Sequence, residues 1–135
     1  MNRFLNEVAG VLETEGVTLD TRFRETEGWC SLKAFGLLVM MENDFSSPMD
    51  IGEFQKQETV RDLFRAAFIS LAARVFGVDR ANLSGGSAYE TFPEWDSVNH
   101  LRLVMEAEKA FGITYPLATI PSLKTLDDFL AAGGL

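Results

Sequence analysis

The hydrophobic positions of this chain recur every three or four residues, which is the period of an amphipathic helix. The first predicted helix carries Phe4, Val8, Val11 and Leu12, and Gly16 is available to terminate it. After a loop, a second helix is predicted to begin at Ser31 and to stop before Ser46. Its apolar positions are Leu32, Phe35, Leu38, Val39 and Phe45.

A short third element and a further helix complete this pattern. The short element is expected at about residues 51–55. The last helix is expected to open at Thr59, because Thr59 and Asp62 form a T-x-x-D sequence of the capping-box type. In such a box, each side chain bonds a backbone N–H at the other end of the turn.

The same order of elements occurs a second time. Residues 29–63 align with residues 95–129 without a gap, at an offset of 66 positions. The identical pairs are Trp29/Trp95, Ser31/Ser97, Leu37/Leu103, Glu42/Glu108, Phe45/Phe111, Thr59/Thr125 and Asp62/Asp128. Upstream the offset becomes 64, which pairs Phe4 with Phe68 and Leu19 with Leu83. We infer a duplicated helical unit.

The fold class predicted from these patterns is all-α, with two four-helix bundles in tandem over residues 1–65 and residues 66–135. No run of β-branched residues alternates with polar ones, as a half-buried strand would require. No glycine, proline or asparagine interrupts residues 59–75. The two bundles are therefore expected to share one continuous helix; the alternative is two helices with a break near residues 64–68.

The composition narrows the range of functions. A net charge of −8 opposes binding to a nucleic-acid backbone, which requires clustered Lys and Arg. One cysteine permits no intramolecular disulfide, and a reducing cytoplasm is the simplest compartment. The longest wholly apolar run, residues 37–41, is too short to span a membrane. We expect a cytoplasmic monomer with no nucleic-acid or membrane partner.

Each unit carries a Trp-x-Ser sequence directly before its second predicted helix. The simplest interpretation is helix capping, because Ser and Asp are preferred at helix N-termini. A second interpretation is a phosphate attached to the serine, because the N-terminus of a helix has unpaired N–H groups and favours negative charge.

The second unit resembles the acyl carrier protein family, whose D-S-L serine carries a 4′-phosphopantetheine arm. The resemblance rests on Asp96-Ser97-Val98 and on the following helix, with Leu103-Val104-Met105, Glu108 and Phe111-Gly112. The resemblance extends over both units, and so over nearly the whole chain, but it is weaker in the first unit. It implies that Ser97 carries the arm, with Trp95, Asp96 and Val98 as motif support.

The family resemblance also implies the function and the partners. The chain would be a non-catalytic carrier of thioester-bound acyl intermediates for fatty-acid, polyketide or polysaccharide-modifying enzymes. Its partners would be a phosphopantetheinyl transferase and the acyl-transferring or ligase enzymes of the pathway.

The first unit departs from the family pattern at one position of the motif. Cys30 stands where the family usually has Asp, and a mostly neutral thiol would help a transferase less than a carboxylate. Ser31, flanked by Trp29, Cys30 and Leu32, is therefore a second and weaker candidate for attachment of the arm.

No catalytic or metal site is predicted. His100, the single histidine, follows Ser97 by three positions on the same helix, where it cannot easily act as a base for that serine. We expect His100 to be exposed. One His and one Cys provide no metal set built from those ligands.

Two alternative functions stay open. One is an aminoacyl or aryl carrier that serves a stand-alone adenylating ligase. The other is an unmodified helical interaction module that has kept the bundle and lost the arm.

Overall fold

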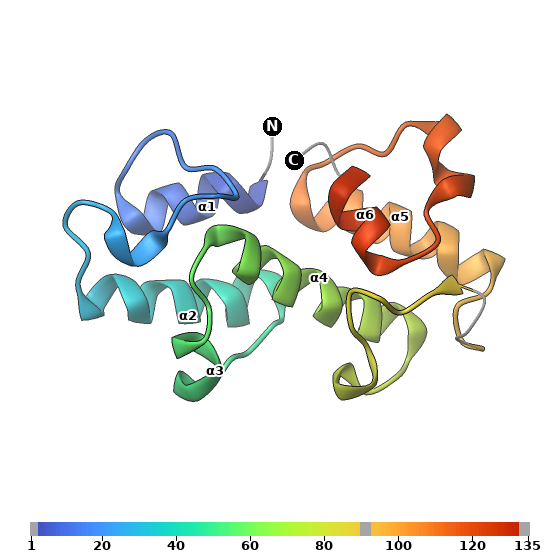
Figure 1. Cartoon of the computed structure of the whole chain (residues 1–135), viewed down its shortest axis with the longest axis horizontal. Coiled ribbons are helices and arrows are strands. Elements are labelled where there is room, and N and C mark those ends of the chain that lie inside the picture. The colour runs from blue at the N-terminus through green and yellow to red at the C-terminus, as the bar shows by residue number, and fades with distance from the viewer. Residues whose placement is uncertain (1–2, 90–92, 133–135) are drawn as a thin grey trace. The chain divides into compact units, whose positions relative to one another are not determined.

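The computed structural model describes residues 3–89 and 93–132 (Figure 1). Over these residues the regular structure is helical, and extended pairing is limited to two isolated bridges, Arg22 with Thr59 and Ala88 with Thr125. The prediction of an all-α chain is therefore confirmed for the part described. None of the helices in these two ranges is long and apolar enough to cross a membrane.

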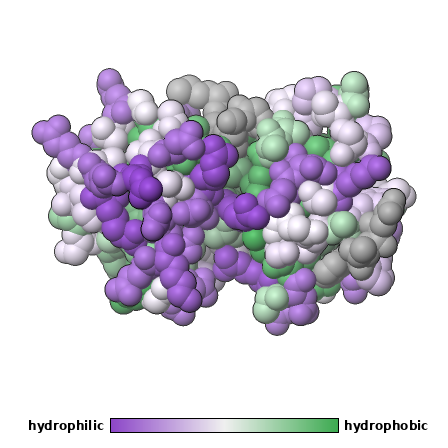
Figure 2. Space-filling model, in the orientation of Figure 1, coloured by the Kyte–Doolittle hydropathy of each residue, from purple (hydrophilic) through white to green (hydrophobic). Residues whose placement is uncertain are grey.

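The chain divides into two compact units, Asn2–Ala67 and Phe68–Leu135, which we call the N-terminal unit and the C-terminal unit. Helix α4 (Val60–Phe76) runs without a break through this division, as the uninterrupted stretch of sequence predicted. Figure 2 shows that hydrophilic residues dominate the visible face of the N-terminal unit, at the left of the view.

The N-terminal unit also contains α1 (Arg3–Leu12), the 3-10 helix η1 (Phe23–Glu25), α2 (Ser31–Phe45) and α3 (Ile51–Gln55). The predicted start of α2 at the serine and the short element at residues 51–55 are both confirmed. The core is aromatic: the Phe4 ring lies 4.9 Å from Phe45 and 5.3 Å from Phe64, measured between centroids.

The packing of α1 on α2 depends on a glycine. A Cβ at Gly36 would lie 2.9 Å from Cγ1 of Val11, closer than carbon atoms pack.

The end of α1 differs from the prediction. The helix stops at Leu12 because Glu13 adopts a left-handed conformation (φ 53°), whereas Gly16 lies in the loop beyond.

The C-terminal unit contains the 3-10 helix η2 (Arg80–Asn82), α5 (Ser97–Phe111), the 3-10 helix η4 (Leu117–Ser122) and α6 (Leu126–Ala132). Its largest fully buried side chains are Phe68, Trp95, Leu103, Phe111 and Phe129. The Phe129 ring lies 5.8 Å from Phe68 and 6.0 Å from Trp95.

Both T-x-x-D sequences form capping boxes, as predicted. At the start of α4, Thr59 N donates to Asp62 Oδ2 at 3.1 Å and Asp62 N donates to Thr59 Oγ1 at 3.4 Å. At the start of α6, the two equivalent bonds between Thr125 and Asp128 are both 3.1 Å. These reciprocal bonds satisfy backbone groups that the first turn of a helix leaves unpaired.

Backbone hydrogen bonds between the loops and the following helices refine the alignment of the two units. Arg61 N donates to Leu19 O at 2.8 Å, and Asp127 N donates to Gly85 O at 2.9 Å. These bonds equate Leu19 with Gly85, and not with Leu83 as the sequence comparison did. The two additional residues of the second loop therefore lie before Gly85.

Candidate functional site

The start of α5 presents an exposed serine beside a capped helix end. Ser97 is the first residue of α5, and its side chain is exposed. The preceding residue, Asp96, accepts a hydrogen bond from Asn99 N at 2.8 Å and is the N-cap. Asp96 and not Ser97 caps the helix, and the Ser97 hydroxyl has no hydrogen-bond partner among the described residues.

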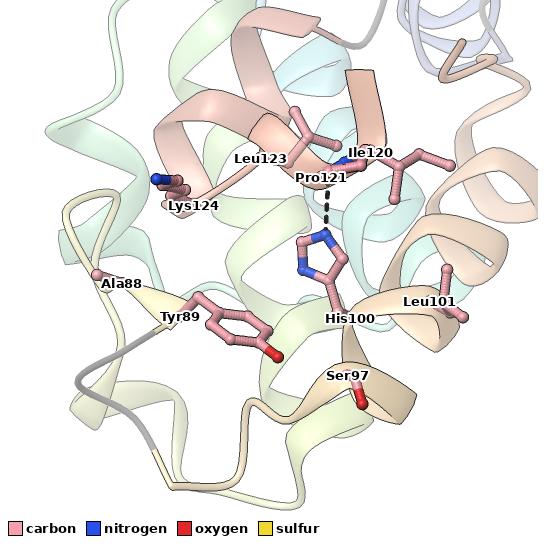
Figure 3. A pocket seen from close by; sticks show the side chains of 9 residues that line it. All are labelled: Ala88, Tyr89, Ser97, His100, Leu101, Ile120, Pro121, Leu123 and Lys124. Carbon is pink, nitrogen blue, oxygen red and sulfur yellow. Dashed lines mark hydrogen bonds between the residues drawn. The ribbon is translucent and has the colours of Figure 1, made fainter. Parts of the chain in front are cut away.

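A pocket of about 640 Å³ lies next to Ser97. Its lining residues come from the loop before α5, from α5 itself and from the η4 region: Ala88, Tyr89, Ser97, His100, Leu101, Ile120, Pro121, Leu123 and Lys124. Figure 3 shows Tyr89 and Ser97 on one side of the pocket and Ile120, Pro121 and Leu123 across from them. The lining is mostly aliphatic and aromatic, so the pocket fits an apolar group.

His100 lines this pocket and is buried, so the prediction that it is exposed is wrong. Trp95 Nε1 donates to His100 Nδ1 at 3.0 Å, and His100 Nε2 lies 2.9 Å from Ile120 O. An indole N–H can only donate, so Nδ1 must be the acceptor. The proton of the neutral ring is therefore on Nε2, which donates to the Ile120 carbonyl (Figure 3).

Aromatic rings enclose the His100 imidazole on three sides. Trp95 stacks on it with 6.0 Å between ring centroids, while Tyr89 at 5.5 Å and Phe129 at 5.4 Å meet it edge to face. The sequence held a signal for this burial. His100 precedes Leu103, Val104 and Ala107 at helical spacing, and these residues form the buried face of α5.

The N-terminal unit places Ser31 in the same way at the start of α2, also exposed. Its N-cap is Cys30, which is exposed and makes no side-chain capping bond. Trp29 is half-buried, with its ring 5.6 Å from Phe23. Ala34 stands where the C-terminal unit has His100, so this tryptophan has no imidazole beside it in the helix.

In the N-terminal unit, Arg24 makes the bonds that correspond to the bond from His100 to the Ile120 carbonyl. Its guanidinium donates to Phe54 O at 2.7 Å and also to Gln57 O. It lies over two aromatic rings, 4.7 Å from the centroid of Phe23 and 5.0 Å from that of Phe54. Phe54 is the repeat equivalent of Ile120. The same backbone carbonyl thus binds Arg24 in one unit and His100 in the other.

Large apolar side chains are exposed on the helix that follows each serine. On α2 these are Leu32, Phe35 and Val39, exposed by 76%, 63% and 36%. On α5 the residues at the same three repeat positions are Val98, Leu101 and Met105, exposed by 65%, 53% and 66%. The apolar positions predicted for α2 therefore do not form one buried stripe, because the buried face is made by Leu37, Met40, Met41 and Phe45.

Comparison with known proteins yields no relative: no family model, curated protein or solved structure matches this chain. Within residues 3–89 and 93–132, no group of three or more His, Cys, Asp or Glu side chains is arranged to hold a metal ion. The attachment of an arm at Ser97 or Ser31 stays a prediction from the sequence.

Proposed function

We propose that this protein is a non-catalytic acyl carrier and that Ser97 bears a covalently attached 4′-phosphopantetheine arm. The observation that carries the proposal is the exposed hydroxyl of Ser97 at the N-terminus of α5, which has no hydrogen-bond partner among the described residues and lies directly beside a mostly apolar pocket of about 640 Å³. In this proposal the two units are carrier-type bundles that share α4, and the C-terminal unit is the principal carrier.

The start of α5 is suited to a phosphodiester. Ser97 and Val98 lie in the first turn, where backbone N–H groups have no carbonyl from a preceding turn. These N–H groups and the positive end of the helix dipole stabilise a phosphate by about 0.3–1 kcal/mol at an exposed site. Asp96 already bonds Asn99 N, so the helix is ordered before the phosphate is attached.

Attachment uses the Ser97 hydroxyl as the nucleophile. Its oxygen attacks the β-phosphorus of coenzyme A, the P–O bond to adenosine 3′,5′-bisphosphate breaks, and the serine proton leaves to a base of the transferase. When bound, the group supplies a thiol that carries acyl cargo as a thioester.

The residues around Ser97 support two further properties of a carrier. Ile120 and Leu123 supply apolar surface that can shelter an acyl chain, at about 25 cal/mol for each Å² removed from water. The exposed side chains of Val98 and Met105 offer an apolar docking surface for the transferase and the acyl-transferring enzymes. Ser31 is the weaker second attachment site, because Cys30 provides no carboxylate.

An aryl carrier is a second candidate within the same class of function. The pocket presents the Tyr89 and His100 rings together. An aromatic cargo could make stacked or edge-to-face contacts with these rings. Mass analysis of the cargo released from protein purified from its native host separates this candidate from a carrier of aliphatic acyl groups.

The test is the intact mass of the full chain after incubation with coenzyme A and a broad-specificity transferase. We expect the first phosphopantetheine to map to the peptide that contains Ser97, any label at Ser31 to appear more slowly, and the Ser97 label to be lost in Ser97→Ala. Ser31→Ala is the matched control and should retain it. A wild-type chain that gains no mass would contradict the proposal and would favour an unmodified interaction module.

A further inference from the structure

We propose that Arg24 occupies, in the N-terminal unit, the site that the C-terminal unit keeps open as the pocket beside Ser97, and that Arg24 thereby confines apolar ligands to the C-terminal unit. The meaning of this difference for acyl cargo rests on the proposed carrier function. The occupation of the site by Arg24 is a property of the unmodified chain and can be tested without the arm.

The repeat identifies the residues of the N-terminal unit that correspond to the wall of the pocket. At the offset of 66 positions, three pairs of residues are equivalent: Phe23 with Tyr89, Phe54 with Ile120, and Gln57 with Leu123. The two isolated bridges fix this register on both sides of the site, because they differ by the same offset: Arg22 with Thr59, and Ala88 with Thr125. The wall of the pocket therefore has a counterpart in the N-terminal unit.

The Arg24 side chain contacts each of these three counterparts. Its guanidinium donates to Phe54 O at 2.7 Å and to Gln57 O, and it lies 4.7 Å from the centroid of the Phe23 ring. The side chain is half-buried, so it packs against these groups instead of extending into solvent. A group that touches all three at once lies in the space that corresponds to the pocket.

The C-terminal unit leaves this space open because a side chain of α5 binds the equivalent carbonyl. His100 donates its Nε2–H to Ile120 O at 2.9 Å (Figure 3), whereas Ala34, at the same position of α2, has no group that can donate. The residue at the repeat position of Arg24 is Glu90, and an ionised carboxylate accepts hydrogen bonds but donates none. A carboxylate at this position cannot replace Arg24 as the donor to two backbone carbonyls.

An apolar ligand can enter the site in the N-terminal unit only if Arg24 leaves it. Its departure breaks two hydrogen bonds from a charged group and the cation–π contacts with the Phe23 and Phe54 rings, at 4.7 and 5.0 Å. An apolar ligand offers no donor to the two carbonyls in return. Hydrogen bonds to a charged group correspond to roughly tenfold or more in an equilibrium constant. We therefore expect the N-terminal unit to bind an apolar ligand at least about tenfold more weakly than the C-terminal unit.

Under the proposed function, Arg24 makes the surroundings of the two serines unequal. An acyl chain on the arm of Ser97 can enter the pocket, whereas Arg24 fills the corresponding space beside Ser31. The C-terminal unit would therefore shelter the cargo, and a chain attached at Ser31 would stay in contact with solvent or with a partner enzyme.

The experiment is an NMR titration of the full, unmodified chain with 1-hexanol, a small aliphatic probe. In the wild type, the amide signals of Ile120 and Leu123 should shift and saturate, while those of Phe54 and Gln57 should show no saturable shift over the same range of concentration. In Arg24→Ala the Phe54 and Gln57 signals should also shift and saturate, with an affinity at least about tenfold higher than that of the N-terminal unit in the wild type.

Arg22→Ala is the matched control for the loss of charge. Arg22 is exposed and forms ion pairs with Glu25 and Glu58, each at 3.6 Å. This variant removes the same charge two positions away from Arg24 without opening the site. The probe should therefore leave the Phe54 and Gln57 signals of Arg22→Ala without a saturable shift.

The double variant Arg24→Ala with Ala34→His gives the N-terminal unit the arrangement of the C-terminal unit. A histidine on α2 can donate to Phe54 O, while the space that Arg24 filled is left open. This variant should bind the probe in both units, and it keeps the proposal testable if Arg24→Ala alone does not fold.

Three results would overturn the proposal. The first is that both units of the wild type saturate at one affinity, and the second is that the Ile120 and Leu123 signals show no saturable shift. The third is that a folded variant without Arg24 gains no second site. Should neither variant fold, the comparison of the two units in the wild type decides the question.

Labelling with coenzyme A separates this inference from the carrier function. Label at Ser97 with equal uptake of 1-hexanol by both units would support the carrier and overturn the role of Arg24. Uptake confined to the C-terminal unit without label would support the role of Arg24 and contradict the carrier.

Discussion

The two units share one helical plan but differ in the side chain that binds the short element before their last helix. In the N-terminal unit Arg24 binds the Phe54 carbonyl, and in the C-terminal unit His100 binds the equivalent Ile120 carbonyl. The difference shows that the equivalent carbonyl can be bound by a side chain from the 3-10 helix before the serine or by a side chain from the helix that follows it.

The N-termini of α2 and α5, the two helices that begin at the serines, also differ. Asp96 caps α5 with a bond of 2.8 Å to Asn99 N, whereas Cys30 makes no side-chain bond at the start of α2. The exposed serine and the exposed apolar residues occur in both units. The features that differ are therefore those that order the start of the helix, and under the proposed function they favour Ser97 over Ser31 as the attachment site.

The largest predicted effect is on the stability of the C-terminal unit, where Tyr89, Trp95 and Phe129 surround His100. Phe129→Ala should lower the free energy of unfolding by about 3–5 kcal/mol, because a fully buried ring is removed from contact with Trp95 and His100. Urea denaturation measures this. The matched control Phe129→Leu introduces the residue that the N-terminal unit has at this position, Leu63, and should cost less. Equal losses in both variants would contradict the importance of the aromatic contacts.

The second prediction concerns Arg24, which binds the Phe54 carbonyl as His100 binds the Ile120 carbonyl. Arg24→Ala should destabilise the N-terminal unit by about 1.5–3 kcal/mol, the range for hydrogen bonds to a charged group. The variant loses the bonds to Phe54 O and Gln57 O and the stacking on Phe23. Arg24→Lys keeps the charge but not the planar two-carbonyl geometry and should recover less than half of the loss. Full recovery by lysine would mean that charge alone matters.

Local patterns predicted much of the fold because its boundaries depend on residues close in sequence. The start of α5 and the two capping boxes follow from side chains within one turn of the feature that they determine, and the unbroken α4 follows from the absence of glycine and proline along its length. The end of α1 was not predictable in this way. Glutamate at position 13 adopts a left-handed conformation that glycine ordinarily favours, and the available glycine lies three residues further on.

The candidate site was predicted only in part, because its walls bring distant segments together. Ser97 and its cap could be predicted from three adjacent residues. The bond from His100 to Ile120 joins residues 20 positions apart, and the bond from Arg24 to Phe54 joins residues 30 positions apart. The sequence gives the periodic face on which His100 lies but not the carbonyl that it meets. The burial of His100 is visible only in the folded structure.

The third prediction uses a buried tyrosine that only the C-terminal unit has, since Met49 is the repeat equivalent of Tyr115. Burial raises the pKa of Tyr115 above its usual value, and the Glu108 carboxylate adds to this effect. The folded state therefore keeps the phenol proton while the unfolded state loses it above about pH 10. Stability from this residue is intact below that pH and is lost as pH rises further, by up to about 1.4 kcal/mol per pH unit.

Denaturation of Tyr115→Phe checks this alkaline slope. At neutral pH the variant should be less stable by about 1 kcal/mol, because it lacks the 2.9 Å bond from the Tyr115 hydroxyl to Phe129 O. Above about pH 10 its stability should fall less steeply than that of the wild type. Parallel curves for the two proteins would show that another group causes the alkaline loss.

The smallest predicted effect tests whether the cap accounts for the difference between the two serines. Cys30→Asp gives α2 the residue that caps α5 and should stabilise the N-terminal unit by about 1 kcal/mol. Asp96→Cys is the reverse exchange and should destabilise α5 by a similar amount, because Asn99 N loses its partner. If the carboxylate also helps the transferase to recognise the motif, the rate of labelling should rise at Ser31 in the first variant and fall at Ser97 in the second. Time-resolved peptide mass measurement gives both rates.

Stabilisation of α2 with no faster labelling of Ser31 would show that the acid caps the helix but does not help the transferase. The next residue to test would then be Phe35, whose exposed ring stands where α5 has Leu101.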